Sequence, residues 1–502
     1  PVRFTNHCWS DIAPDDAMMH AVAETAPFYA PDLEAIEFPA WDCLPYDRAS
    51  PSLGITARRL KALWTLQQPA GVPQLLVTTV NAVTQRTLTP FRIRQVGAEL
   101  KPGMMIAREA LIEKLVRQGY ARTDTVADSG EFAVRGNLID IFPAGMDSGL
   151  RLDFFGDELD TMRAFDPGTQ RSTERVERHI LLPASEVLLD ADSIKRFRSA
   201  YREAFGANAT TDPLYQAISD GRRLAGMEHW LPMIEERLVP LFEHLDDADI
   251  VLRDAGADAA ADQRFESITD YHANRQRGNE DKAGSYRPLK PSALYLVPKE
   301  WRAAEGETPI HLVSSHDEPE SQRVLGLGYR TARDFGAERA RGDNVYAAAV
   351  AHIEQLRAAN RGAIIASYSE GSRSRLLGLL KDHGLARMAL AGSWQEALGQ
   401  AATGMASMVV LPQDHGFATD RYEILSEQDL LGDRLVRRRK KRKSADAFLA
   451  ELQSLAAGDL VVHIDHGIGR YEGLVSIPVG KSPHDCVWLT YAGGDKLYVP
   501  VE

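Results

Sequence analysis

Three short patterns in the sequence carry residue types that could do chemistry. Gly480-Lys481-Ser482 has the ending of a phosphate-binding loop, in which backbone N–H groups and the lysine hold phosphate oxygens. The first glycine of such a loop would fall at position 475, which is Val475, and the triplet lies between two strand-like segments instead of between a strand and a helix. The sequence therefore predicts no nucleotide site at this triplet.

The other two patterns could bind metal ions. Asp157-Glu158-Leu159-Asp160 imitates a DExD box, but Asp153-Phe154-Phe155-Gly156 precedes it instead of a buried apolar strand, and Asp157 falls in a turn. His463 and His466 have HxxH spacing, yet an extended strand and turn would place their rings irregularly, which favours a structural role. No HExxH or GxSxG motif and no prominent carboxylate pair occurs. We expect no catalytic residue, metal site or cofactor in this chain.

The elements around the DExD-like pattern form a predicted β-hairpin. Strands at 151–155 and 158–162 flank Gly156-Asp157, a pair that favours a tight turn with positive φ. This register places three pairs of residues opposite each other: Phe155 and Glu158, Phe154 and Leu159, and Arg151 and Met162.

Alternation along these strands gives the hairpin two faces. Leu152, Phe154 and Leu159 share an apolar face, which is predicted to be the core side. The other face carries Arg151, Asp153, Phe155, Glu158 and Asp160. The aromatic residue among these charges is either a loosely packed surface side chain, which is common, or part of a surface that holds a partner.

The segment from Gly130 to Pro167 resembles the second domain of the bacterial transcription-repair coupling factors and, more distantly, the UvrA-binding domain of the excision-repair protein UvrB. In that family the domain docks onto UvrA through an arginine of an RG pair, an arginine that opens an RLDFF strand, and the second phenylalanine of that strand. The matching positions here are Arg135, Arg151 and Phe155. The resemblance implies that these three side chains bind UvrA.

Composition limits the class of protein. The 502 residues are enough for three or four domains, and the net charge of −13 argues against a chain dominated by nucleic-acid contacts. The three cysteines, Cys8, Cys43 and Cys486, form no CxxC pair, so neither a disulfide framework nor a zinc site is indicated and a reducing cytoplasm fits best. No apolar run is long enough to span a bilayer, and no signal peptide is apparent.

Alternating strand and helix patterns predict two α/β regions. The first has a helix at 55–66 and a strand at 74–80. The second has helices at 347–359 and 372–382 and strands at 362–367 and 408–411.

The strand-rich domain is predicted to be inserted into the first α/β region. An amphipathic helix is expected to begin at Lys101-Pro102-Gly103, and the domain is expected to close near Pro183. A helix follows at 193–205. The polar stretches 246–262 and 269–291 predict mobile surface loops.

Two aromatic segments of the first region also match the coupling factors. The segment 38–52, FPAWDCLPYDRASPS, resembles a family signature, although a packed loop is the favoured interpretation of its residues. The segment 225–234, AGMEHWLPMI, resembles an element that belongs to the second half of the same domain.

Seven consecutive basic residues lie in a predicted linker at 432–457, followed by a short helix at 444–455. Such a run is usually a solvated tract; contact with a DNA backbone is the alternative. The residues concerned are Arg437, Arg438, Arg439, Lys440, Lys441, Arg442 and Lys443.

The last 45 residues consist of short strands and turns, with a hairpin predicted between 487–491 and 496–500. The motif VVHIDHGIGRYEGL resembles the CarD-like RNA-polymerase interaction domain of the coupling factors, a small SH3- or Tudor-like barrel. An aliphatic residue just beyond the strand 470–475 contacts the polymerase in that family, and Ile477 aligns with it.

Together these resemblances imply a multidomain α/β and α+β chain from the N-terminal half of a cytoplasmic, ATP-dependent DNA translocase that acts at stalled RNA polymerase. They imply UvrA and the RNA polymerase β subunit as partners, and place ATP, Mg and DNA contacts in motor domains beyond this chain, which begins without Met and looks like a fragment. The expected boundaries are 1–100 and 184–315 for a UvrB-like α/β domain, 101–183 for the inserted UvrA-binding-like domain, 316–431 for a small α/β domain, 432–457 for the linker and 458–502 for the barrel.

Two rival functions come from other classes. A self-sufficient UvrB-type helicase and ATPase would need a P-loop before the first helix and a DNA-clamping aromatic hairpin, and neither is visible. A stand-alone transcription regulator with a CarD-like domain would not need the segment from Gly130 to Pro167.

Overall fold

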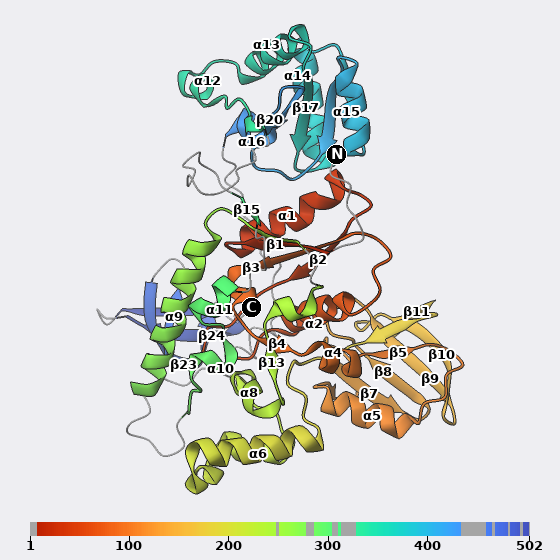
Figure 1. Ribbon diagram of the computed structural model, residues 1–502, viewed down its shortest axis with the longest axis vertical. Coiled ribbons are helices and arrows are strands. Elements are labelled where there is room, and N and C mark those ends of the chain that lie inside the picture. The colour runs from red at the N-terminus through yellow and green to blue at the C-terminus, as the bar shows by residue number, and fades with distance from the viewer. Residues whose placement is uncertain are drawn as a thin grey trace. The chain divides into compact units, whose positions relative to one another are not determined.

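The computed structural model describes residues 8–246, 250–277, 286–303, 310–312, 328–432, 458–463, 467–479, 482–491 and 495–500. The chain divides into two compact units, residues 1–432 and 433–502 (Figure 1). The first unit contains three principal sheets, and the second contains one.

The first sheet is parallel, as the alternation of strands and helices predicts. Its five strands have the order β15-β14-β1-β3-β2. Ser52 caps the helix α2 with its hydroxyl, and Asp15 caps α1 with its carboxylate. The elements are β1 (Cys8–Ala13), α1 (Asp16–Tyr29), β2 (Glu34–Phe38), α2 (Leu53–Leu66), β3 (Gln74–Thr79), α3 (Val80–Val83), β14 (Ile250–Arg253) and β15 (Ile310–His311).

A buried polar cluster joins this domain to the residues that follow the insertion. Arg59 Nε donates to Glu186 Oε1 over 2.6 Å, and Trp41 Nε1 donates to the same oxygen over 2.8 Å. His229 Nε2 accepts from the backbone N–H of Tyr46 over 2.9 Å, and burial lowers the pKa of His229 to about 4. The segment 38–52 is thus a packed loop, as its residues predict.

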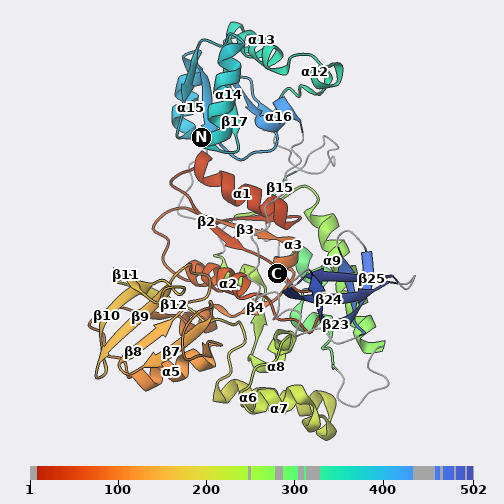
Figure 2. The same cartoon turned by 180° about the vertical axis from the view of Figure 1, so that it is seen from behind.

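The second sheet has six strands in the order β11-β10-β9-β8-β7-β6, and the helix α5 (Arg108–Arg117) covers one face (Figures 1 and 2). Leu111 and Leu115 of α5 pack on the apolar face of the strands. The strands β5 (Ala98–Leu100) and β12 (His179–Leu181) pair with each other and bring together the two ends of the chain segment that forms this domain. The six strands are β6 (Ala121–Arg122), β7 (Glu131–Arg135), β8 (Leu138–Ile141), β9 (Gly149–Phe155), β10 (Glu158–Phe165) and β11 (Ser172–Arg175).

The helix predicted from Lys101 begins seven residues later, at Arg108. The preceding segment turns at Pro102-Gly103 and then hydrogen-bonds with the β9–β10 hairpin: Gly103 N–H donates to Leu159 O over 2.8 Å, and Ile106 N–H donates to Asp157 O over 2.8 Å. Pro102 and Gly103 disfavour helix, which explains the late start.

The prediction of mobile loops at 246–262 and 269–291 is wrong where the structure has a strand and a helix. Strand β14 occupies 250–253, and the helix α9 (Ala257–Arg277) runs for 21 residues. The five alanines and three arginines of α9 favour helix, and Ala257, Ala261 and Ile268 form its buried side.

Short helices and strands complete the first domain. The capping box of Asp190 and Ser193 starts α6, which ends at Phe205 as predicted. The elements are β4 (Thr87–Leu88), α4 (Pro90–Val96), α6 (Ala191–Phe205), η1 (Ala207–Thr211), α7 (Pro213–Ser219), η2 (Met227–Trp230), α8 (Leu231–Ile234), β13 (Leu238–Val239), η3 (Leu241–His244), α10 (Pro291–Leu294) and α11 (Pro298–Ala303).

The third sheet confirms the second predicted α/β region. Its order is β16-β20-β21-β17-β19-β18, with β17 parallel to both neighbours. The elements are β16 (Arg330–Thr331), α12 (Gly336–Arg341), α13 (Val345–Ala358), β17 (Gly362–Ser367), α14 (Glu370–Asp382), β18 (Met388–Leu390), α15 (Trp394–Ala402), β19 (Ala406–Val410), β20 (Phe417–Ala418), β21 (Tyr422–Ser426) and α16 (Glu427–Leu431).

The second unit is an antiparallel sheet in the order β22-β23-β24-β25. The predicted hairpin at 487–500 is confirmed by the pairing of Val487 with Val499. The sequence predicts that Ile477 lies just beyond its strand. In the structure Ile477 lies within β23, opposite His484. The strands are β22 (Leu460–His463), β23 (Gly467–Val479), β24 (Ser482–Thr490) and β25 (Lys496–Pro500).

The basic run 437–443 and the predicted helix at 444–455 lie outside the described residues. In the part of the chain that the structure describes, no helix has the length and apolar character needed to cross a bilayer.

Candidate protein-binding site on the second sheet

The face of the second sheet opposite α5 carries all three residues that the resemblance implies. Residues directly opposite each other in antiparallel strands share a face. Asp140 pairs with Arg151, Leu138 pairs with both Arg135 and Asp153, and Phe155 pairs with Glu158. Arg135, Arg151 and Phe155 therefore lie in three successive rows of one face.

Arg151 is held in place by the sheet. Its Nε and Nη2 donate to the two carboxylate oxygens of Asp140 over 2.7 and 2.9 Å, and its guanidinium lies 5.0 Å from the centre of the Phe165 ring. The hydrogen bonds to Asp140 raise the pKa of Arg151 above its ordinary value. The Arg151 side chain is 18% exposed, Asp140 is 1% exposed, and Arg151 Nη1 also donates to Ser172 Oγ over 3.1 Å. Only a small part of the guanidinium is therefore available to a partner.

Gln170 connects Arg151 with Arg135. Its backbone carbonyl accepts from Arg151 Nη1 over 3.3 Å, and its side-chain Oε1 accepts from Arg135 Nη2 over 3.4 Å. The amide nitrogen of Gln170 donates to the carbonyls of Val126 and Pro167 over 2.7 and 2.6 Å. Gln170 has φ of 61°, a left-handed conformation that these bonds stabilise.

Arg135 is exposed, with one further hydrogen bond, from its Nε to the carbonyl of Asp124 over 3.3 Å. The long distances of its two bonds leave it free to exchange them for a carboxylate or carbonyl of a partner. Arg135 and Arg151 thus form a paired basic site with Gln170 between them.

Phe155 lies apart from the two arginines, at the hairpin end of β9. It is four residues beyond Arg151, about 13 Å along an extended strand. Its side chain is 80% exposed. This exposure rules out packing within the domain, so the prediction of an aromatic residue among charges is confirmed.

The predicted register is correct at the turn and wrong at the far end. Phe155 and Phe154 pair with Glu158 and Leu159, but Arg151 pairs with Arg163 and not with Met162. The pairing shifts between Leu159 and Thr161, because Asp160 is an extra residue, a β-bulge. The core face predicted for Leu152, Phe154 and Leu159 is confirmed, since all three are buried.

Sequence reasoning missed Asp140 and Gln170. Asp140 sits between Ile139 and Ile141 in an otherwise apolar strand, and a carboxylate in that setting is a signal for a buried ion pair. Gln170 carries no comparable signal, because its role depends on a loop conformation that bulky residues rarely adopt.

The edge of the first sheet where a P-loop would lie is acidic. Asp15 Oδ1 accepts from Met18 N–H at the start of α1, and Asp16 is in the first turn. Burial, reinforced by repulsion from Asp254, raises the pKa of the buried Asp11 in β1 to about 7. The Asp15 carboxylate thus takes an N–H group that an anion at the start of α1 would use.

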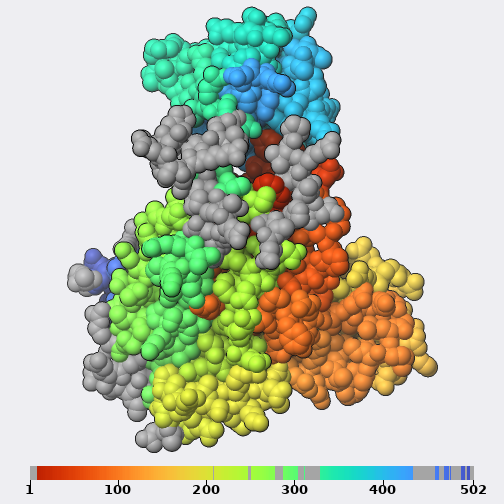
Figure 3. Space-filling model, in the orientation of Figure 1, coloured from red at the N-terminus to blue at the C-terminus, as the bar shows by residue number. Residues whose placement is uncertain are grey.

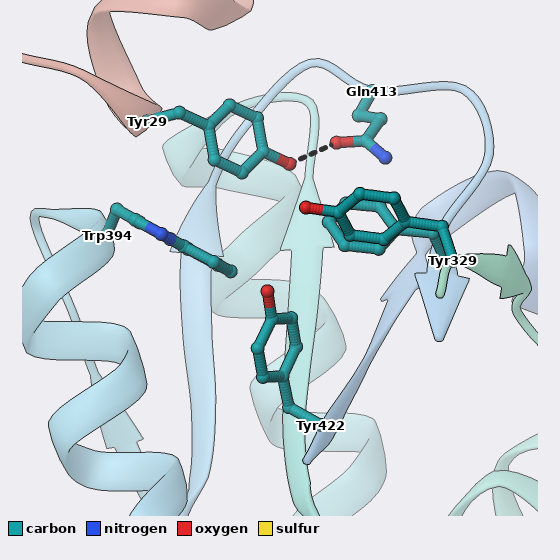
Figure 4. A pocket seen from close by; sticks show the side chains of 6 residues that line it. Tyr29, Tyr329, Trp394, Gln413 and Tyr422 are labelled. Carbon is teal, nitrogen blue, oxygen red and sulfur yellow. Dashed lines mark hydrogen bonds between the residues drawn. The ribbon is translucent and has the colours of Figure 1, made fainter. Parts of the chain in front are cut away.

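A pocket of about 640 Å³ lies where the end of α1 meets the third sheet (Figure 4). Tyr29 donates a hydrogen bond of 2.6 Å to Gln413 Oε1, and its ring meets that of Trp394 edge-on at 5.0 Å. None of the described side chains that line the pocket is charged. The lining residues are Tyr29, Tyr329, Trp394, Gln413, Phe417 and Tyr422.

Several other residues that the sequence analysis considers lie outside the described residues. Gly480, Lys481 and His466 are among these, as is the basic run 437–443. Ile477 has a described position in β23. Among the described residues, no group of three or more His, Cys, Asp or Glu side chains could hold a metal ion.

Comparison with known families places two segments of the chain. Residues 98–187 match the family model of the UvrB interaction domain, which covers the whole second sheet and the β5–β12 pair. Residues 455–502 match the CarD-like/TRCF RID domain.

The most similar curated proteins carry one name. A transcription-repair-coupling factor from Escherichia coli (strain K12) is 32% identical over 471 residues, which is 92% of this chain and 39% of that protein. Those from Haemophilus influenzae and Rickettsia bellii are 31% and 30% identical over 92% and 95% of the chain, and 40% and 41% of their own lengths. The chain spans about two-fifths of the length of the curated relatives it matches.

Proposed function

Because the chain is related to the transcription-repair-coupling factors over most of its length, we propose that it is a two-partner adaptor segment of such a factor. The second sheet binds UvrA, and the C-terminal unit binds RNA polymerase through its β subunit. The complete protein then recruits excision repair to stalled transcription.

The observation that carries this proposal is the exposed face of the second sheet within the matched residues 98–187. That face combines an 80% exposed Phe155 with the paired basic site of Arg135 and Arg151. Aromatic and arginine side chains with this exposure and anchoring are the usual energetic centres of protein interfaces.

The sheet β22–β25 supports the polymerase-binding part of the proposal. Its four antiparallel strands lie within the segment that matches the CarD-like/TRCF RID domain. We assign it a small SH3- or Tudor-like barrel, with Ile477 on the polymerase-contacting surface. The basic run 437–443 is proposed to lie in the linker and to contact DNA backbone only weakly and without sequence preference.

We further propose that the whole protein is an ATP-dependent DNA translocase whose ATP and Mg sites lie in motor domains outside this chain. Two observations are consistent with a chain that does not hydrolyse ATP itself. The edge of the first sheet beside α1 is acidic, and Val475 stands where a phosphate-binding loop that ends at Gly480-Lys481-Ser482 would need a glycine. The self-sufficient UvrB-type helicase is disfavoured, because the relatives are coupling factors and the match to UvrB is confined to its interaction domain.

The direct test is to titrate purified UvrA into this chain by calorimetry and to measure ATP hydrolysis with DNA. Micromolar or tighter binding with no ATP turnover is expected. Absence of binding would contradict the adaptor role, and turnover by this chain would favour the helicase alternative. Polymerase β subunit, added in a separate titration, tests the second partner independently.

A further inference from the structure

Residues 103–106, which precede α5, hydrogen-bond with the hairpin end of the second sheet. Leu159 N–H donates to Met104 O over 3.0 Å, and Met105 forms an isolated antiparallel bridge with Glu158. Together with the bonds from Gly103 and Ile106, this segment occupies the edge of β10 at the hairpin end, whereas β11 pairs with β10 farther along, at Arg163 and Phe165.

Side chains along this segment alternate between the two faces of the sheet. Met104 and Ile106 pack against the core cluster under α5. Met105, between them, points to the opposite face and is 71% exposed. Exposure of an apolar methionine side chain to water costs free energy. The backbone hydrogen bonds of Met104 and Ile106 fix the direction of the Met105 side chain between them.

Met105 and Phe155 flank the same residue of β10. Phe155 pairs with Glu158 from one side, and Met105 pairs with Glu158 from the other. Directly opposed residues share a face, so the three side chains form one row across three strands, with the backbones of Met105 and Phe155 about 10 Å apart. Figure 3 shows the domain that carries them as one continuous orange and yellow surface.

We propose that Met105 is a second apolar anchor of the UvrA-binding surface, in a row of Phe155, Glu158 and Met105. This inference rests on the proposed function. The row fits a partner surface with two apolar contact points on either side of a basic or N–H donor group that meets Glu158. The flexible thioether adapts to such a surface, and the rigid backbone bridge limits the entropy lost on binding.

The test uses the complete chain and measures UvrA binding by titration calorimetry for Met105→Lys, Met105→Leu and Phe155→Ala. Met105→Lys should weaken binding at least tenfold, because a charge in an apolar contact loses its hydration without gaining a partner. Met105→Leu should retain binding within about threefold, since it keeps the apolar volume. Thermal unfolding should be unchanged in each variant, because both side chains are exposed.

Val116→Lys is the matched control. Val116 lies on α5, which covers the opposite face of the sheet, and it is 50% exposed. The control should bind UvrA like the unsubstituted chain. A loss for Phe155→Ala with full binding by Met105→Lys would overturn the inference and leave the proposed function standing. If neither variant changes the affinity, or the unsubstituted chain does not bind, the proposed UvrA surface fails and the inference fails with it.

Discussion

Arg151 donates two hydrogen bonds to the carboxylate of Asp140, its direct neighbour on β8. Asp140 is almost fully buried, so this arginine is part of the architecture of the sheet as well as of the proposed interface. Removing Arg151 and removing Phe155 should therefore have different effects.

Arg151→Ala is expected to destabilise the second domain by about 3 kcal/mol or more, because Asp140 is left as a buried charge without its partner. The double variant Arg151→Ala/Asp140→Ala should recover part of that loss. Hydrogen exchange of the β8 and β9 amides in the whole chain measures the stability of this domain separately from the others. Equal exchange rates in Arg151→Ala and the unsubstituted chain would show that the ion pair does not stabilise the sheet.

Phe155→Ala is expected to lower UvrA affinity by about 2 kcal/mol or more and to leave the exchange rates of β8 and β9 unchanged. An exposed side chain contributes little to folding but loses its full contact area in a complex. Calorimetric titration gives the affinity. A folded Phe155→Ala chain with unaltered affinity would remove Phe155 from the interface.

Gln170→Ala is expected to weaken UvrA binding about fivefold, although Gln170 itself need not touch the partner. The substitution removes the acceptor that positions Arg135 and the two amide bonds that hold the loop. Thr169→Ala, one residue earlier and exposed, serves as the control. In a double-mutant cycle, Gln170→Ala and Arg135→Ala should be non-additive; full additivity would mean that Gln170 does not act through Arg135.

Ile477→Arg is expected to abolish binding to the polymerase β subunit while circular dichroism remains unchanged. A charge placed in an apolar contact costs several kcal/mol, whereas a charge on a solvated surface costs almost nothing. Ile468→Arg, on the same strand β23 and already 65% exposed, is the matched control and should keep its binding. Retained binding by Ile477→Arg would place the polymerase contact elsewhere.

Asp11→Asn is expected to stabilise the first domain at pH 8, because burial and repulsion from Asp254 make the charged form of Asp11 unfavourable in the folded state. The folded pKa of Asp11 is raised to about 7, above the ordinary value of 3.8. Between these values the folded state keeps a proton that the unfolded chain has released, so stability falls as pH rises from about 4 to about 7. Hydrogen exchange of the β1 amides against pH should show this slope in the unsubstituted chain and in Asp16→Asn, and a flatter one in Asp11→Asn.

Much of the binding site follows from local rules of the sequence. The Gly156-Asp157 turn and the alternation of Leu152 and Phe154 with charged residues are enough to place Phe155 on the open face. The shift at Asp160 could not be predicted, because it lies between the part of β10 that meets the Met105 segment and the part that pairs with β11, and the hairpin sequence alone indicates neither pairing. The same limit applies to Gln170, because its partners Arg151, Arg135 and Val126 are 19 to 44 residues away along the chain.

The helix α9 replaces part of the loops that composition predicts. Acidic, alanine and polar residues at 246–262 and 269–291 predict loops, but the buried contacts of Ala257, Ala261 and Ile268 hold a helix whose alanine and arginine residues favour that conformation.

The pairing of β5 with β12 has a consequence for how such a protein can change over time. His179 faces Leu100, so the chain enters and leaves the second domain at adjacent points. Because its ends are adjacent, such an inserted domain can be gained, lost or exchanged, and the surrounding domain then needs only a short connection in its place. The proposed partner-binding surface therefore lies in a replaceable module, separable from the parallel sheet that carries it.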